Sequence, residues 1–247
     1  MKRPPVIEIC RDKGEWMTKA VVKNCIPGLE YLTQLDSVLV KRMMNWIEIL
    51  RKIDPKNKYI VKNMIGQSVY YAIEDSNQCL RWCCGTKRPS NIFVYDKSDS
   101  VVLKIEHPFQ NNCFNISCIC CKCCRNQIKI TTGSDQVLGY IQEINNCGFI
   151  VYFILDENSK LLLILKGPHY CHGCCSSRSD FSFKIMDNTG KVEIGAITNS
   201  WRCWTQEWLS NSENFGVQFP IDLAVNVKAL ALAATFFIDF LYFERIN

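Results

Sequence analysis

Apolar residues alternate with polar ones over most of the chain, and this period of two constrains the fold more than any other feature. Between about residues 57 and 228 the pattern recurs, for example at Val101, Leu103 and Ile105. Such alternation gives a β-strand one apolar face. Short clusters of turn-forming residues, as at 96–99, separate the runs and join them as hairpins. The pattern predicts a mainly β protein.

The hairpins give about eleven strands. Ten of them form five pairs: 58–63 with 68–74, 91–96 with 100–106, 127–132 with 137–143, 149–155 with 160–166, and 181–187 with 191–197. The eleventh expected strand carries Leu223, Val225 and Val227. So many antiparallel strands favour a closed barrel or a sandwich, because closure removes unpaired edges. Residues 29–53 fit either a helix or a strand.

Length and composition limit the class of protein. The chain has 247 residues, 48% hydrophobic and 21% charged, which excludes a disordered chain and a polytopic membrane protein. Its net charge of +5 suits an anionic membrane surface but predicts no nucleic-acid partner. Residues 1–25 are expected to be a short flexible segment, and 26–247 one domain. The segment has no apolar run typical of a secretory signal, so we expect the chain to start in the cytosol.

A fifteen-residue apolar run, 229–243, follows Lys228 and is closed by Glu244. A helix of this length spans about 22 Å, less than the roughly 30 Å of a bilayer core, and Asp239 within it opposes insertion. A helix that is apolar on all sides also fits the interior of a barrel. The sequence leaves both possibilities open and favours the buried one.

Sixteen cysteines need a use other than disulfides, because a reducing compartment disfavours disulfides. Five lie within seven residues, beside Lys122 and Arg125: Cys118, Cys120, Cys121, Cys123 and Cys124. This density favours S-palmitoylation at a membrane face. A zinc site is the alternative, with two Cys-x-x-Cys pairs as ligands: Cys121, Cys124, Cys171 and Cys174.

The chain has no phosphate loop, dinucleotide fingerprint or hydrolase elbow, so we expect no enzyme. Its three histidines, His107, His169 and His172, have no nucleophile or carboxylate motif around them. Residues 211–222 weakly match an EF-hand loop, with oxygen side chains at loop positions 1, 3 and 12 and glycine at 6.

Several segments together resemble the phospholipid scramblase family over about residues 26–245. They are 27–32, 57–59, 66–67, 72–75, 120–124, 167–168, 214–223 and 238–244, in that order. The resemblance implies a tubby-type fold, a twelve-stranded barrel around a hydrophobic C-terminal helix. It also implies calcium ligands in the twelve-residue segment, at Asn211, Glu213, Phe215, Val217, Phe219 and Asp222.

The chain departs from the family in three places. Asn211 and Glu213 replace aspartates, so calcium binding should be weak, and the basic nuclear-import segment and the proline-rich leader are missing. The family implies calcium-responsive, ATP-independent movement of phospholipids between leaflets, by a palmitoylated protein at the cytoplasmic face of the plasma membrane. Because one fifteen-residue helix offers no hydrophilic track for headgroups, this function also requires either self-association or an indirect role. The alternative is a palmitoylated, membrane-tethered regulatory module without lipid transport.

Overall fold

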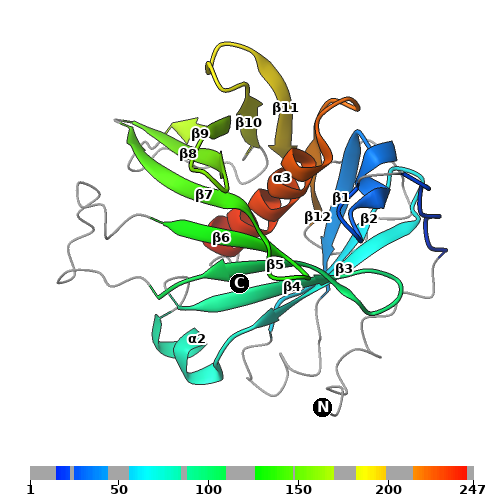
Figure 1. Cartoon of the computed structure of the whole chain (residues 1–247). Coiled ribbons are helices and arrows are strands. Elements are labelled where there is room, and N and C mark those ends of the chain that lie inside the picture. The colour runs from blue at the N-terminus through cyan, green and yellow to red at the C-terminus, as the bar shows by residue number, and fades with distance from the viewer. Residues whose placement is uncertain are drawn as a thin grey trace.

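A closed antiparallel barrel surrounds one helix in the computed structural model of the chain (Figure 1). The structure describes residues 15–22, 25–43, 56–84, 88–109, 126–146, 148–169, 182–198 and 214–243. Within these ranges twelve strands close in the order β1-β12-β11-β10-β9-β8-β7-β6-β5-β4-β3-β2. Apart from the β1–β12 closure, neighbours in the barrel are neighbours in sequence, as hairpin connections require.

The strands have these bounds: β1 Ser37–Arg42, β2 Lys58–Lys62, β3 Ser68–Asp75, β4 Ser90–Tyr95, β5 Val101–His107, β6 Gln127–Thr132, β7 Val137–Asn146, β8 Phe149–Asp156, β9 Leu161–His169, β10 Ser182–Met186, β11 Glu193–Thr198 and β12 Asn214–Gln218. The helical elements are the 3-10 helix η2 (Glu30–Gln34), α2 (Gln78–Cys84), α3 (Val225–Ile238) and the π-helix η7 (Asp239–Phe243). The predicted barrel with an apolar C-terminal helix is therefore confirmed.

The ten paired strands expected from the hairpins are present, but the last strand was placed wrongly. Leu223, Val225 and Val227 do not form a strand, because α3 begins at Val225 and three alternating apolar residues also fit the start of a helix. The strand that closes the barrel is β12, which lies within the twelve-residue segment 211–222, where the sequence predicts a calcium loop or a turn before the last strand. The ambiguous segment 29–53 contains both kinds of structure, η2 and β1.

Residues before 25 contact the barrel. Ser68 donates its backbone N–H to the carbonyl of Glu15 at 2.8 Å, and it accepts from Met17 N–H at 3.0 Å. Lys19 forms an ion pair with the carboxylate of Asp96 at 2.8 Å. The part of the N-terminal segment that the structure describes is therefore held against the β2–β3 and β4–β5 hairpins.

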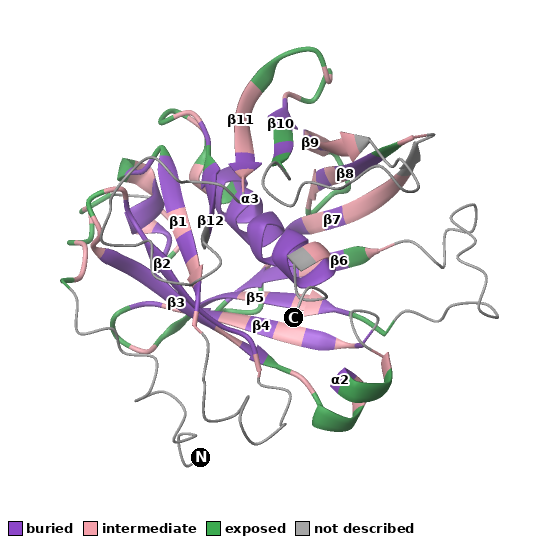
Figure 2. Cartoon of the chain, turned by 180° about the vertical axis from the view of Figure 1, so that it is seen from behind, coloured by how far each residue is buried: buried purple, intermediate pink, exposed green. Residues whose placement is uncertain are grey.

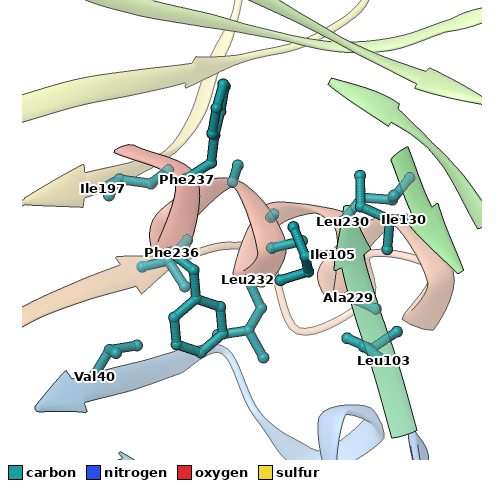
Figure 3. Close-up of a cluster of buried hydrophobic side chains, with 14 of the residues drawn as sticks. Val40, Leu103, Ile105, Ile130, Ile197, Ala229, Leu230, Leu232, Phe236 and Phe237 are labelled. Atoms are coloured by element: carbon teal, nitrogen blue, oxygen red, sulfur yellow. The ribbon is translucent and has the colours of Figure 1, made fainter. Parts of the chain in front are cut away.

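The core lies between α3 and the inner faces of the strands (Figure 2). Figure 3 shows the helix side chains Leu230, Leu232, Phe236 and Phe237 pointing outward from the helix toward different strands. On β7, Gly139 permits this approach, since a Cβ there would stand 2.2 Å from the carbonyl oxygen of Leu155 and 3.1 Å from Leu230 Cδ1. Burying apolar side chains on every side of the helix stabilises it inside the barrel.

Candidate functional site: the central helix and one end of the barrel

The central helix is the element that most limits what the barrel can do. The stretch Val225–Tyr242, in the part of the chain that the structure describes, is long and apolar enough to cross a membrane, but 83% of it is buried in the protein. Alanine and leucine favour a helix in this run, and no acidic residue interrupts it before Asp239. The expectation of a buried helix is confirmed, and its two charged residues are the features to explain.

Lys228 lies near the start of α3 and is fully buried. Its ammonium group donates to three backbone carbonyls, those of Leu32 at 3.0 Å, Leu35 at 2.7 Å and Ile221 at 2.8 Å. Burial lowers the pKa of Lys228. A single cation thus satisfies carbonyl groups at the end of η2 and at the entry to α3, and it holds the helix to the barrel at this end.

Asp239 lies at the other end of the helix and is also fully buried. Its carboxylate forms an ion pair with the guanidinium of Arg42 at the end of β1. It also accepts a hydrogen bond from the Tyr59 hydroxyl of β2, at 2.6 Å. Burial, the largest influence, raises the pKa of Asp239, while Arg42 and Tyr59 favour its charged form. The helix is therefore bound by a charged contact at each end.

A second buried ion pair lies nearby, between Glu74 of β3 and Arg88. Arg88 donates to Glu74 Oε1 through Nε at 3.0 Å and Nη2 at 2.7 Å, and Asn57 donates to Oε2 at 2.6 Å. The Arg88 guanidinium also lies 4.6 Å from the ring centroid of Phe240 in η7. Sequence reasoning missed this pair, although an acidic residue on the inner face of an apolar strand could have indicated it.

His107, at the end of β5, completes this polar layer. Its Nδ1 lies 3.0 Å from the backbone carbonyl of Arg88, so Nδ1 carries the proton, and its ring packs against Phe237 and Phe240. Burial lowers the pKa of His107. Its Nε2 is buried and has no hydrogen-bond partner among the described residues. His107 is therefore a buried histidine that packs in the core at this end of the barrel.

The two ends of the barrel differ sharply. At the end where α3 begins, the connections between strands are tight turns, such as 63–67 and 156–160. At the other end, which we call the loop-bearing end, the connections are 43–57, 76–89, 108–126, 147–148, 170–181 and 199–213, and α3 and η7 also end there. Every cysteine of the chain except Cys10 and Cys25 lies within these connections.

A family model of scramblases matches residues 16–245, which is nearly the whole chain and covers all twelve strands and the helix. The chain belongs to the scramblase family.

Named relatives cover the same region. The chain is 36% identical to phospholipid scramblase 1 of Mus musculus over 222 residues, which is 90% of this chain and 65% of the relative. It is 34% identical to phospholipid scramblase 2 of Homo sapiens over 223 residues, 90% of this chain and 72% of the relative. The chain therefore spans just under two thirds of the length of the mouse relative.

The cysteine cluster and both zinc pairs lie outside the described residues. The structure shows only where their segments leave and rejoin the barrel: Cys118, Cys120, Cys121, Cys123 and Cys124 lie between β5 and β6, and Cys171 and Cys174 lie between β9 and β10. Among the residues that are described, no group of three His, Cys, Asp or Glu side chains could hold a metal ion. Palmitoylation and zinc binding remain predictions.

The segment that the family resemblance assigns to calcium is only partly described. Asn211 and Glu213 lie outside the described residues, as does Glu244 at the far end of the chain. Phe215, Val217 and Phe219 are buried, and β12 pairs with β1 over residues 214–218 and with β11 over residues 216–218. Asp222 is exposed and follows β12 at the end where α3 begins.

The strand therefore separates the two ends of this calcium segment. At about 3.3 Å per residue, β12 alone extends about 13 Å. Asn214, which follows Glu213 directly, stands at the loop-bearing end, whereas Asp222 stands beyond the opposite end of the strand. Calcium binding stays a prediction, and β12 does not have the compact form of an EF-hand loop.

Proposed function

We propose that this protein moves phospholipids between the two leaflets of a membrane, without ATP and in response to calcium. The observation that carries the proposal is the scramblase family match across the whole barrel and helix. Relatives named phospholipid scramblases support the lipid substrate. No covalent step on the lipid is part of the proposal, since exchange between leaflets changes no bond.

The buried helix limits how lipid could move. Because Lys228 and Asp239 are held inside the barrel, α3 offers no polar track for a headgroup while it stays there. We therefore place the lipid-handling surface on the outside of the barrel, at the loop-bearing end. Self-association of two or more barrels on the membrane would give a longer path for headgroups than one barrel offers.

We propose that calcium acts weakly and at one end of the 211–222 segment. The separation of Asp222 from the residues that precede Asn214 supports ligands drawn from Asn211 and Glu213, at the loop-bearing end. A site with so few carboxylates belongs to the roughly millimolar class. Asn211→Asp should therefore tighten calcium binding, measured by calorimetry on the full chain, and a micromolar dissociation constant for the unchanged chain would contradict the proposal.

Reconstitution tests the lipid transport directly. The full chain, produced without acyl groups, is placed in vesicles that carry a fluorescent phospholipid, and a membrane-impermeant reductant bleaches only the outer leaflet. When protein and calcium are present and no ATP is added, we expect bleaching to go beyond the outer-leaflet fraction. In protein-free vesicles, bleaching should stop at that fraction. Bleaching that stops at the outer leaflet although calcium is present and the protein is bound to the vesicles would refute lipid transport.

One observation favours a second function. Lys228 of α3 and Asp239 of η7 both have polar partners inside the barrel, so the helix has no structural need for lipid. A membrane-tethered regulatory module, attached through palmitoylated cysteines at the cytoplasmic face of the plasma membrane, would need only such a barrel. This candidate gains support if the vesicle assay shows binding to anionic vesicles without any lipid transport.

A further inference from the structure

The short helix α2 presents thiols that the scramblase assignment does not use. Asn77 caps its start, since Asn77 Oδ1 accepts the backbone N–H of Cys79 at 2.9 Å. Arg81 fixes its inner side: the guanidinium is buried and donates to the carbonyl oxygen of Ser76 at 2.9 Å and to Ser76 Oγ at 3.0 Å. The orientation of α2 is therefore set by residues of the chain around it.

The outer side of α2 carries Cys79, Trp82 and Cys83. These positions are three and four residues apart and lie on one face of the helix, with about 5–6 Å between Cβ atoms. Both thiols are exposed, and the Trp82 side chain is 68% exposed. Figure 2 draws most of α2 in the colour of exposed residues, and α2 lies away from the central helix α3. Trp82 and the two thiols together give the outer side of α2 an exposed apolar face that carries both thiols.

The position of α2 indicates which surface. The helix connects β3 to β4 at the loop-bearing end, and β4 starts at Ser90, which pairs with His107 at the end of β5. The Cys118–Cys124 segment belongs to the connection 108–126, which leaves the barrel at the end of β5. Two cysteine-bearing segments therefore leave the barrel from adjacent strands at the same end.

Exposed aromatic residues mark the same end. Of the large hydrophobic side chains that are exposed in the described part of the chain, the three aromatic ones, Trp82, Phe109 and Phe149, all lie at the loop-bearing end. The turns and the α3 entry at the opposite end expose only aliphatic ones, Ile65, Val101, Val192 and Ile221. Aromatic side chains are preferred where protein meets the headgroup region of a bilayer. A lipid surface therefore fits this end better than the other.

We propose that Cys79 and Cys83 are a second S-acylation site, which anchors the loop-bearing end of the barrel to the membrane. The donor is a long-chain acyl thioester of coenzyme A. The Sγ of each cysteine attacks the thioester carbonyl, the bond from that carbonyl to the coenzyme A sulfur breaks, and coenzyme A leaves as the thiol with the proton from Sγ. The inference rests on the proposed function only in placing this end against lipid.

Two acyl chains on one helical face explain the pairing of the thiols. One chain gives marginal, reversible attachment, whereas two give stable attachment. Cys84 follows Cys83 directly but is only half exposed and lies away from the outer face. It therefore serves as an internal control on the same helix.

Tryptic peptides can separate the sites, because cleavage after Arg81 divides the two thiols. The peptide 63–81 contains Cys79 alone, and the peptide 82–87 contains Cys83 and Cys84. The full chain is expressed in cells, free thiols are blocked, thioesters are cleaved with hydroxylamine, and the released thiols are tagged and mapped by mass spectrometry. We expect tags on both peptides, loss of the second tag in Cys83→Ser, and its retention in Cys84→Ser.

The membrane consequence is measured after replacing the five clustered cysteines by serine. In that background we expect part of the protein to stay on membranes, and Cys79→Ser with Cys83→Ser to release it, while Cys25→Ser at the other end changes nothing. Absence of hydroxylamine-dependent tags on both peptides would overturn the proposal, whether or not the cluster is tagged. The lipid-transport assay uses protein without acyl groups, so its outcome is independent of this one.

Discussion

Replacing Asp239 by leucine removes the carboxylate that neutralises Arg42 in the barrel interior. Asp239 is fully buried and Arg42 is 6% exposed, so water cannot take the place of the lost partner. Breaking a buried ion pair from one side costs about 3–5 kcal/mol, because the remaining ion loses the charge of this partner while it stays buried. The Tyr59 hydroxyl also loses its acceptor, which costs about 1–3 kcal/mol. We expect the single change to lower the free energy of unfolding by about 4 kcal/mol or more.

The double variant Arg42→Met with Asp239→Leu should recover most of this loss. It removes both charges, and apolar replacement of a buried ion pair is often neutral or stabilising. The remaining cost is the unpaired Tyr59 hydroxyl, which Tyr59→Phe removes in turn. In Arg42→Met alone, the carboxyl of Asp239 is expected to take up a proton. Its pKa, already raised by burial, then rises further, and stability should fall as pH increases from about 4 through the folded-state pKa.

Urea unfolding of the four proteins in this cycle gives the coupling free energy. We expect the double variant to be more stable than the Asp239→Leu variant by about 2–4 kcal/mol, and Asp239→Asn, which keeps an acceptor for Tyr59, to be less damaging than Asp239→Leu. Two costs that simply add in the double variant would show that the two groups do not interact and would refute the reasoning.

Three further changes test other contacts. Lys228→Met should lower the free energy of unfolding by about 2–4 kcal/mol, because three buried carbonyls lose their donor. Since burial lowers the pKa of Lys228, the stability of the wild type should also rise relative to that of the variant as pH approaches the ordinary lysine value of 10.5. A stability difference that does not change with pH would contradict this. His107→Gln should flatten the loss of stability between pH 7 and 5, because the lowered pKa of His107 makes the unfolded chain bind more protons; an unchanged slope would argue against it. Gly139→Val should lower thermal stability by several degrees, because its side chain would meet the Leu155 carbonyl, and an unaltered midpoint would be inconsistent with the close approach of α3 to β7.

The strands that the sequence predicts are those whose alternation is long and bounded by tight turns. β4 and β5 are examples: apolar side chains recur at period two on both sides of the turn at Asp96. The sequence pattern did not predict β12, because the strand has only two alternating apolar residues, Phe215 and Val217. Its partner β1 is also distant in the sequence. Alternation over five residues is too short to identify a strand whose partner lies far away in the sequence.

The candidate site was less accessible to sequence reasoning. Asp239 could be expected to need a hydrogen-bond partner, because a buried carboxylate requires one. Its partners Arg42 and Tyr59 come from the distant β1 and β2, and only closure of the barrel brings them to the helix end. The α2 helix was also missed, since seven residues are too few to show a helical period.

The central claim is that α3 remains the core of the barrel while the protein is on a membrane. Alkaline-carbonate extraction tests it once acyl chains cannot hold the protein, in a chain with serine at Cys79, Cys83 and the five clustered cysteines. We predict complete extraction, both for this chain and for the same chain with Arg42→Met and Asp239→Leu. A helix that spans the bilayer would instead gain retention from the loss of Asp239, which removes about 3 kcal/mol of insertion cost. Protein that resists carbonate in either form would contradict the claim.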